Sequence, residues 1–191
     1  KINQLYKKKI KPFKSRYLFL NGKISQKNFG EEKKVLIAPT WHTNFYALNL
    51  HVKFKNMFDE EKIDYILRPH PMSFKKKEIS INELKKNNIN FDANNELDFK
   101  KYSHLITDWS GIFVEYSIIN KRFSILINTK QKIRNINSKK FQDLPIEIIA
   151  RDILGNSLEV DNINDIKKII HKNNIDEKNI INKFYTENFF D

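Results

Sequence analysis

The segment Thr107-Asp108-Trp109-Ser110-Gly111-Ile112-Phe113-Val114-Glu115 decides the fold of this chain. The apolar run before it, residues 103–106, predicts a buried strand, and residues 112–119 predict a helix. A strand that turns through Ser-Gly directly into a helix leaves backbone N–H groups at the helix start without helical partners. Together with the positive end of the helix dipole, these donors favour an anion. The sequence therefore predicts a nucleotide-diphosphate site here, with Glu115 placed to accept hydrogen bonds from sugar hydroxyls.

Strands alternate with helices on both sides of this segment. We expect strands at 35–38, 63–67, 89–91, 103–107 and 123–127, and helices at 45–62, 79–86, 96–102, 111–120, 164–172 and 176–190. This alternation predicts an α/β fold, a Rossmann-like parallel sheet with helices on both faces. Residues 129–150 lack clear periodicity and are predicted to form a long, irregular, basic loop.

The chain divides into three expected parts. Residues 1–32 are interpreted as a basic interdomain or remnant segment, 33–160 as the Rossmann-like nucleotide-binding domain, and 161–191 as carboxyl-terminal helices that pack back on it. The sequence begins at Lys1 without a methionine, which suggests a piece of a longer protein.

The composition bounds the function classes. The chain has 191 residues and a net charge of +12, from 35 Lys and Arg against 23 Asp and Glu. Such a charge fits nucleic acid, an anionic membrane surface or a phosphorylated substrate. Only residues 7–11 and 75–77 are dense basic clusters, which indicate either docking to an anionic leaflet or a solvated face. No cysteine occurs, so disulfides and thiolate metal sites are excluded, and no set of His and carboxylates has metal-ligand spacing. We predict neither a metal nor a cofactor.

A second polar loop, Arg68-Pro69-His70-Pro71, follows the expected strand at 63–67. A guanidinium can hold a phosphate through its planar fork, and an imidazole can donate to a phosphate oxygen. The two prolines restrict the backbone on either side of His70, which suits a side chain that must point one way. A third loop, Pro39-Thr40-Trp41-His42, follows the strand at 35–38. Ligands of parallel sheets bind at the carboxyl ends of the strands, so all three loops are expected at one site.

These three motifs, in this order and spacing, resemble the carboxyl-terminal half of CDP-glycerol glycerophosphotransferases. The resemblance covers about residues 33–128. It implies one half of a two-domain GT-B glycosyltransferase fold, here the half that binds the donor nucleotide. It further implies His70 as a catalytic residue near the donor's diphosphate with Arg68, Ser110 and Gly111 on the same group, and Glu115 on the ribose.

The resemblance also places Thr40 near the cleft between the domains. Asp108 is interpreted as structural, capping the helix start, because a carboxylate facing a diphosphate would be repelled. Two departures stand out. The family has Tyr-Ser-Ser where this chain has Trp109-Ser110-Gly111, and an Arg at the position of His42. The family's proposed general base lies in an amino-terminal acceptor domain, in a Trp-His-Gly segment that this chain does not contain.

We therefore expect transfer of glycerol phosphate, or a related polyol phosphate, from a CDP-linked donor to a cell-surface polymer or lipid-linked acceptor. The chain would supply the donor-binding half and lack the acceptor domain. Two alternatives remain open. One is a UDP-type nucleotide-sugar glycosyltransferase or epimerase of the same fold, and the other a non-catalytic basic α/β binding module. A nucleic-acid partner is not expected, since no reading module is recognisable. The expected location is cytoplasmic, peripheral on the inner face of the cell membrane.

Overall fold

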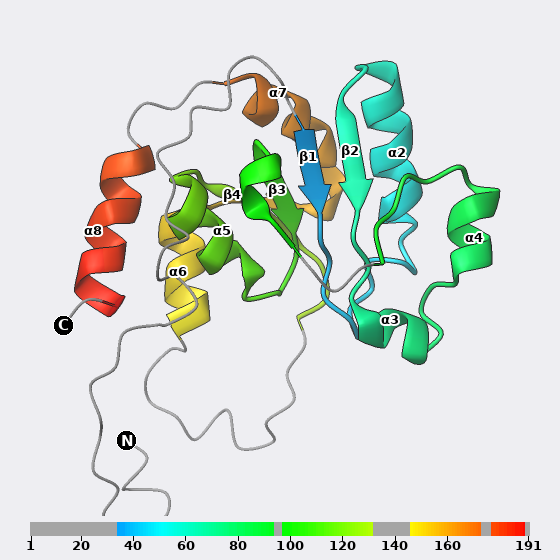
Figure 1. The fold of residues 1–191 in the computed structure, drawn as a ribbon, viewed down its shortest axis with the longest axis horizontal. Helices are drawn as coiled ribbons and strands as arrows, with labels where there is room; N and C mark the ends of the chain where they lie inside the picture. The colour runs from blue at the N-terminus through cyan, green and yellow to red at the C-terminus, as the bar shows by residue number, and fades with distance from the viewer. Residues whose placement is uncertain (1–33, 94–96, 132–145, 173–176, 190–191) are drawn as a thin grey trace, which may run out of the picture.

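The computed structural model describes residues 34–93, 97–131, 146–172 and 177–189. Five parallel strands form one sheet in the order β2-β1-β3-β4-β5 (Figure 1). The strands are β1 (Lys34–Ile37), β2 (Asp64–Leu67), β3 (His104–Thr107), β4 (Ser124–Asn128) and β5 (Gly155–Glu159). The expected fold class, a Rossmann-like α/β domain built on a parallel sheet, is confirmed.

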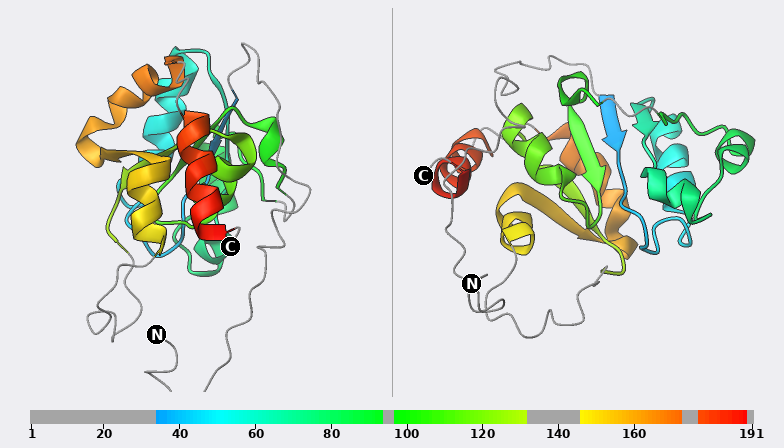
Figure 2. Two further views of the ribbon diagram at one scale, coloured as in Figure 1. Left: turned by 90° about the vertical axis from the view of Figure 1, so that its left-hand side faces the viewer. Right: turned by 60° about the horizontal axis from the view of Figure 1, so that its bottom comes forward.

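Helices connect the strands and cover both faces of the sheet. They are α2 (Leu50–Glu60), α3 (Pro71–Lys75), α4 (Ile81–Lys86), α5 (Ile112–Asn120), α6 (Ile146–Leu154), α7 (Ile166–His171) and α8 (Glu177–Phe189), with 3-10 turns η2 (Phe99–Lys101) and η4 (Val160–Asp165). Figure 2 shows α6 and α8 side by side on one face, with α2 and α7 on the other. The expected segment 1–32 lies outside the described residues.

The two faces follow from alternation along the strands, because successive side chains point to opposite sides of a sheet. On β1, Val35 and Ile37 belong to the core that packs against α2, α7 and η4. Leu36, between them, belongs to the core formed with η2, α5, α6 and α8. Burial on both faces explains the continuous apolar runs of β1 and β4, residues 35–37 and 125–127.

The carboxyl-terminal helices contribute to both cores. On α7, Ile166 and Ile170 are buried against the first face. On α8, Ile181 and Phe184 are buried against the second. The two helices that follow β5, α7 and α8, therefore pack on opposite faces of the sheet.

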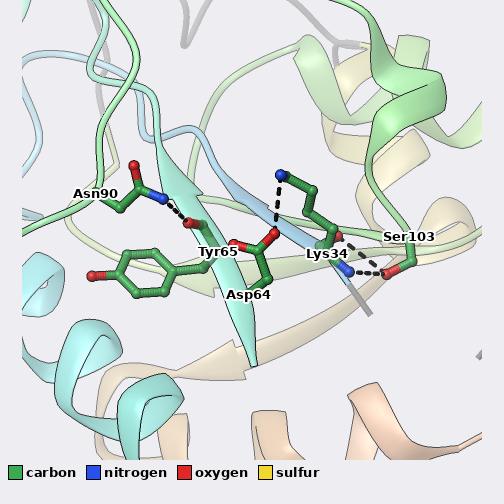
Figure 3. A network of polar contacts seen from close by, with 5 residues as sticks. All are labelled: Lys34, Asp64, Tyr65, Asn90 and Ser103. Carbon is green, nitrogen blue, oxygen red and sulfur yellow. Dashed lines mark hydrogen bonds and ion pairs between the residues drawn. The ribbon is translucent and has the colours of Figure 1, made fainter. Parts of the chain in front are cut away.

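Polar contacts fix the strands at the amino-terminal edge of the sheet (Figure 3). Lys34 Nζ lies 3.0 Å from Asp64 Oδ2, which joins β1 to β2. The Ser103 hydroxyl accepts from the Lys34 N–H at 3.0 Å and lies 3.1 Å from the Lys34 carbonyl, which joins the residue before β3 to β1. The Asn90 amide donates to the Tyr65 carbonyl at 2.9 Å. These contacts hold the starts of β1, β2 and β3 together.

Several local predictions were wrong. The strand predicted at 89–91 forms only an isolated bridge, between Phe91 and Leu67, and within the helix predicted at 96–102 residues 99–101 form the 3-10 turn η2. Residues 146–150 are helical, as the start of α6, so the irregular loop predicted for 129–150 is shorter at its carboxyl end; residues 132–145 lie outside the described residues. The strand β5 was not predicted, because its first residue is a glycine, which usually signals a turn. At this point β4 and β5 approach so closely that a Cβ on Gly155 would lie 2.1 Å from Leu126 Cδ1. Glycine is therefore required here by close packing.

Candidate donor-nucleotide site

The strand order places the three predicted loops around a topological switch point. From β1 the chain crosses to β2 on one side and then returns past β1 to β3 on the other. Connections leave adjacent strands in opposite directions at such a point, so a crevice opens at their carboxyl ends, where ligands of open α/β sheets bind. The loop after β1 borders the loop after β3 on one side and the loop after β2 on the other. The prediction that all three loops share one edge is confirmed.

Asp108 ties the loops after β1, β3 and β4 together. Its side chain is fully buried and accepts from the Thr40 N–H at 2.7 Å and the Thr43 hydroxyl at 2.9 Å. The Thr129 hydroxyl, just past β4, donates to the same carboxylate at 3.3 Å. Burial raises the pKa of Asp108, and the donated hydrogen bonds oppose that rise. The arrangement serves to fix loop geometry around the switch point.

The predicted capping role of Asp108 is wrong. The N-cap of α5 is Gly111, which has no side chain to bond the first turn. The Asp108 carboxylate points instead to the neighbouring loops, because three donors there compensate its burial. The start of α5 thus keeps its backbone donors uncapped by a side chain, apart from a long 3.5 Å contact from the Ile112 N–H to Ser110 Oγ.

Gly111 is exposed at the start of α5, and its surroundings are open. Its φ of −64° is accessible to any residue, and a Cβ added there would meet nothing within 4 Å. Neither backbone strain nor packing requires a glycine at this position, unlike at Gly155. The absence of a side chain leaves the approach to the backbone N–H groups of α5 unobstructed from outside. Ser110 and Glu115, in the preceding turn and the first turn of α5, are both partly buried.

His70 lies in the loop after β2. It is the N-cap of α3, and its Nδ1 accepts from the Met72 N–H at 3.1 Å, while Pro71 begins the helix. Pro suits this first helical position because its missing N–H would have no partner there. Since Nδ1 accepts, the proton of the neutral ring is on Nε2, where it can be donated to a ligand. The cap bond from Met72 and the start of α3 at Pro71 determine how the His70 ring is held.

Trp41 connects His70 to the central loop. Its ring centre lies 6.1 Å from that of His70 and 5.8 Å from that of His42. The His42 N–H donates to Glu78 Oε1 at 2.7 Å, and the residue has a positive φ of 66°. The loop after β1 therefore contacts both other loops, Asp108 on one side and His70 on the other.

Arg68, directly after β2, has a carboxylate partner within the fold. Its guanidinium pairs with Asp92, with 3.8 Å between Nη1 and Oδ2, and both side chains are largely buried. The charge of Arg68 is thus partly balanced within the fold.

Sequence reasoning missed Arg151, which lies on α6. Its side chain is 5% exposed, and its Cζ lies 4.0 Å from the centre of the Trp109 ring. One guanidinium nitrogen donates to the Asp108 carbonyl and the other to Asn128 Oδ1 at 2.8 Å. The Trp109 indole N–H in turn donates to the Thr129 carbonyl at 2.7 Å. We call Asp108, Thr40, Thr43, Thr129 and Arg151 the Asp108 cluster.

A second group of buried polar residues comes from the loop after β1, from α2 and from α3. Tyr46, His51 and Ser73, here the His51 cluster, are at most 7% exposed. Among the described residues, the Tyr46 hydroxyl, both His51 ring nitrogens and the Ser73 hydroxyl have no hydrogen-bond partner. The nearest carboxylate oxygen to His51 is Oε1 of Glu83, 3.9 Å from Nε2. Burial lowers the pKa of His51, and Glu83 opposes this.

No group of three or more His, Cys, Asp or Glu with metal-binding geometry occurs in the described residues. None of the described helices is long and apolar enough to cross a membrane.

Comparisons with known proteins identify relatives of this site. Residues 7–128 match the family model described as CDP-Glycerol:Poly(glycerophosphate) glycerophosphotransferase. The matched range contains all three loops. No curated protein matches the chain. A solved structure of the wall teichoic acid polymerase TagF, a substituted form soaked with CDPG, is similar, with 21% identity and a TM-score of 0.40. The match covers 84% of this chain and 38% of that chain, so the present chain spans well under half of the polymerase.

Proposed function

The chain belongs to the CDP-glycerol:poly(glycerophosphate) glycerophosphotransferase family, and we propose that it binds the diphosphate of a CDP-linked polyol donor at the start of α5. The observation that carries this proposal is the open Gly111 turn at the topological switch point. Its backbone donors and the dipole of the nine-residue helix α5 favour an anion. Ser110 supplies a hydroxyl to the same group, and Glu115 accepts from the ribose.

We propose that the reaction is transfer of glycerol phosphate, or a related polyol phosphate, to a polymer or lipid-linked hydroxyl. The acceptor oxygen attacks the β-phosphorus of the donor, a new P–O bond forms, and the bond between that phosphorus and the bridging oxygen breaks. CMP leaves with the bridging oxygen and its negative charge. The proton of the acceptor hydroxyl passes to a base that we assign to an amino-terminal acceptor domain.

His70 is the proposed catalytic residue on this side of the reaction. Its ring is fixed with the proton on Nε2, so it can donate to the leaving phosphate as charge develops there. Arg68, which also pairs with Asp92, supplies positive charge to the same group. Thr40, held by Asp108, lines the side of the site that would face the acceptor domain.

A matched pair of substitutions at Gly111 tests the diphosphate site. Gly111→Asp and Gly111→Asn have nearly the same shape and are both accommodated by the open surroundings, so neither should unfold the chain. The Asp carboxylate would repel a diphosphate, whereas the Asn amide would not. Calorimetric titration with CDP should show at least about tenfold weaker binding for Gly111→Asp than for Gly111→Asn. Equal affinities of the two variants would contradict the site.

The choice of nucleotide separates this proposal from its alternatives. Titration with CDP, UDP, CMP and inorganic pyrophosphate should show a preference for CDP. Preference for UDP would instead favour a nucleotide-sugar transferase or epimerase of the same fold. Absence of any nucleotide binding, with strongly salt-dependent DNA binding, would favour a non-catalytic basic module.

We also propose that the enzyme works in the cytoplasm at the inner face of the membrane, where its acceptor would be anchored. Lys75, Lys76 and Lys77 are exposed at the end of α3 and offer a contact for anionic headgroups. Sedimentation with vesicles containing phosphatidylglycerol should decrease when all three are changed to Gln. Unchanged sedimentation would contradict the membrane contact and mean that these lysines are only solvated surface residues.

A further inference from the structure

We infer that Arg151 is a positioning residue that holds the Trp109-Ser110-Gly111 turn in the shape that binds the donor's diphosphate. This inference rests on the proposed function and extends it to a residue outside the three sequence motifs. Arg151 lies 40 residues after Gly111 and outside the range that matches the family model. It reaches the turn from α6, which packs against α5 (Figure 1).

Arg151 contacts two residues at the base of the turn and one at the end of β4. The guanidinium lies over the face of the Trp109 ring, where the ring's electron density attracts a cation. It also donates to the Asp108 carbonyl, the peptide unit that leads into Trp109. Its second donor nitrogen bonds Asn128 at the end of β4. One side chain thus fixes a ring, a peptide unit and the neighbouring strand in one geometry.

The supports of Arg151 are themselves fixed. The Asn128 amide donates to Glu159 Oε1 at 2.7 Å, which determines that its oxygen faces Arg151. The Ser117 hydroxyl of α5 lies 3.3 Å from the carbonyl of Leu154 on α6, and Ala150 and Leu154 are fully buried. The helix that carries Arg151 therefore has little freedom to shift relative to α5.

A lysine cannot replace this arrangement. Lysine retains the positive charge, but it lacks the planar fork that donates in two directions while stacking on a ring. A role that depended only on charge would survive Arg151→Lys, whereas a positioning role would not. The lysine variant therefore distinguishes geometry from electrostatics, and Arg151→Met removes both while keeping most of the volume.

The test measures binding and the environment of the indole separately. Trp109 is one of only two tryptophans, so Trp41→Phe leaves it as the single indole of the chain. In that background, Arg151→Lys and Arg151→Met should each change the fluorescence emission of Trp109. Each should also weaken the binding of inorganic pyrophosphate at least about fivefold. Of the log affinity that Arg151→Met loses, Arg151→Lys should recover less than half. Arg122→Lys is the matched control, because Arg122 contacts Ser103 and His104 at the opposite edge of the sheet and should change neither.

The outcomes separate this inference from the proposed function. If the Trp41→Phe chain does not bind pyrophosphate although the parent chain does, the same comparison is made by calorimetry with Trp41 present. If the parent chain itself fails to bind pyrophosphate and CDP, the proposed function and this inference both fall. If the parent binds and both Arg151 variants bind equally well, only this inference is overturned. Binding fully restored in Arg151→Lys also overturns it, because charge alone would then suffice. Thermal unfolding of each variant confirms that the folded chain is measured, and if Arg151→Met does not fold, the lysine variant decides.

Discussion

The Asp108 cluster and the His51 cluster are both buried, yet they differ in how their polar atoms are satisfied. The Asp108 carboxylate has donors from two loops, and Arg151 bonds two acceptors. In the His51 cluster, four side-chain atoms have no hydrogen-bond partner among the described residues. Buried polar groups stabilise a fold when they are bonded and destabilise it when they are not. The first cluster should therefore be intolerant of substitution, and the second should tolerate apolar replacement.

The largest expected effect is that of Asp108→Ala. The change removes the acceptor of three hydrogen bonds and leaves the buried Thr40 N–H without its partner. We expect the free energy of unfolding to fall by about 3 kcal/mol in urea denaturation. Asp161→Ala is the control, because Asp161 is exposed, and it should change stability by less than about 0.5 kcal/mol. A loss below about 1 kcal/mol for Asp108→Ala would mean that the loops hold together without this cluster.

How far the sequence predicts this site depends on how local the responsible contacts are. The positions of Ser110, Gly111 and His70 follow from strand ends, since a parallel sheet brings such ends to one edge whatever the details of packing. The environment of Arg68 was not predictable in this way, because Asp92 reaches it from beyond two intervening helices.

The role of Arg151 was hidden for a related reason. Its partners Asp108 and Asn128 are 43 and 23 residues away in the chain. Its helix ends at Leu154, and the next residue, Gly155, suggests a turn from the sequence alone but is the first residue of a strand. Only the close approach of Leu126 in the folded sheet explains that glycine.

The next effect is the pH dependence of stability that the buried His51 should cause. Burial lowers the pKa of His51, so below the ordinary value of about 6.5 the unfolded chain binds a proton that the folded chain does not. The stability associated with neutral His51 is therefore complete above about pH 6.5 and decreases as the pH falls toward the folded-state pKa. Between pH 7 and pH 5 the parent chain should lose up to about 2 kcal/mol more than His51→Met.

The measurement is urea unfolding of the parent chain and of His51→Met at several pH values. If the parent and His51→Met have parallel profiles, then Glu83 compensates the charge of His51 on protonation, and the cluster is less poorly satisfied than its geometry indicates.

The smallest expected change in stability is that of removing a tyrosine hydroxyl, and its sign should differ between two buried tyrosines. The Tyr46 hydroxyl has no partner that meets hydrogen-bond geometry, although Ser73 is a neighbour, whereas the Tyr116 hydroxyl donates to the Tyr102 carbonyl at 3.4 Å. Removing an unbonded buried hydroxyl relieves its desolvation, so Tyr46→Phe should leave stability unchanged or raise it by up to about 1 kcal/mol. Tyr116→Phe should lower stability by about 0.5–1 kcal/mol, since it deletes a bond and leaves a carbonyl less satisfied. Differential scanning calorimetry of the two variants resolves this difference, and a clear loss in Tyr46→Phe would show that its hydroxyl is bonded in solution, which would remove the contrast between the clusters.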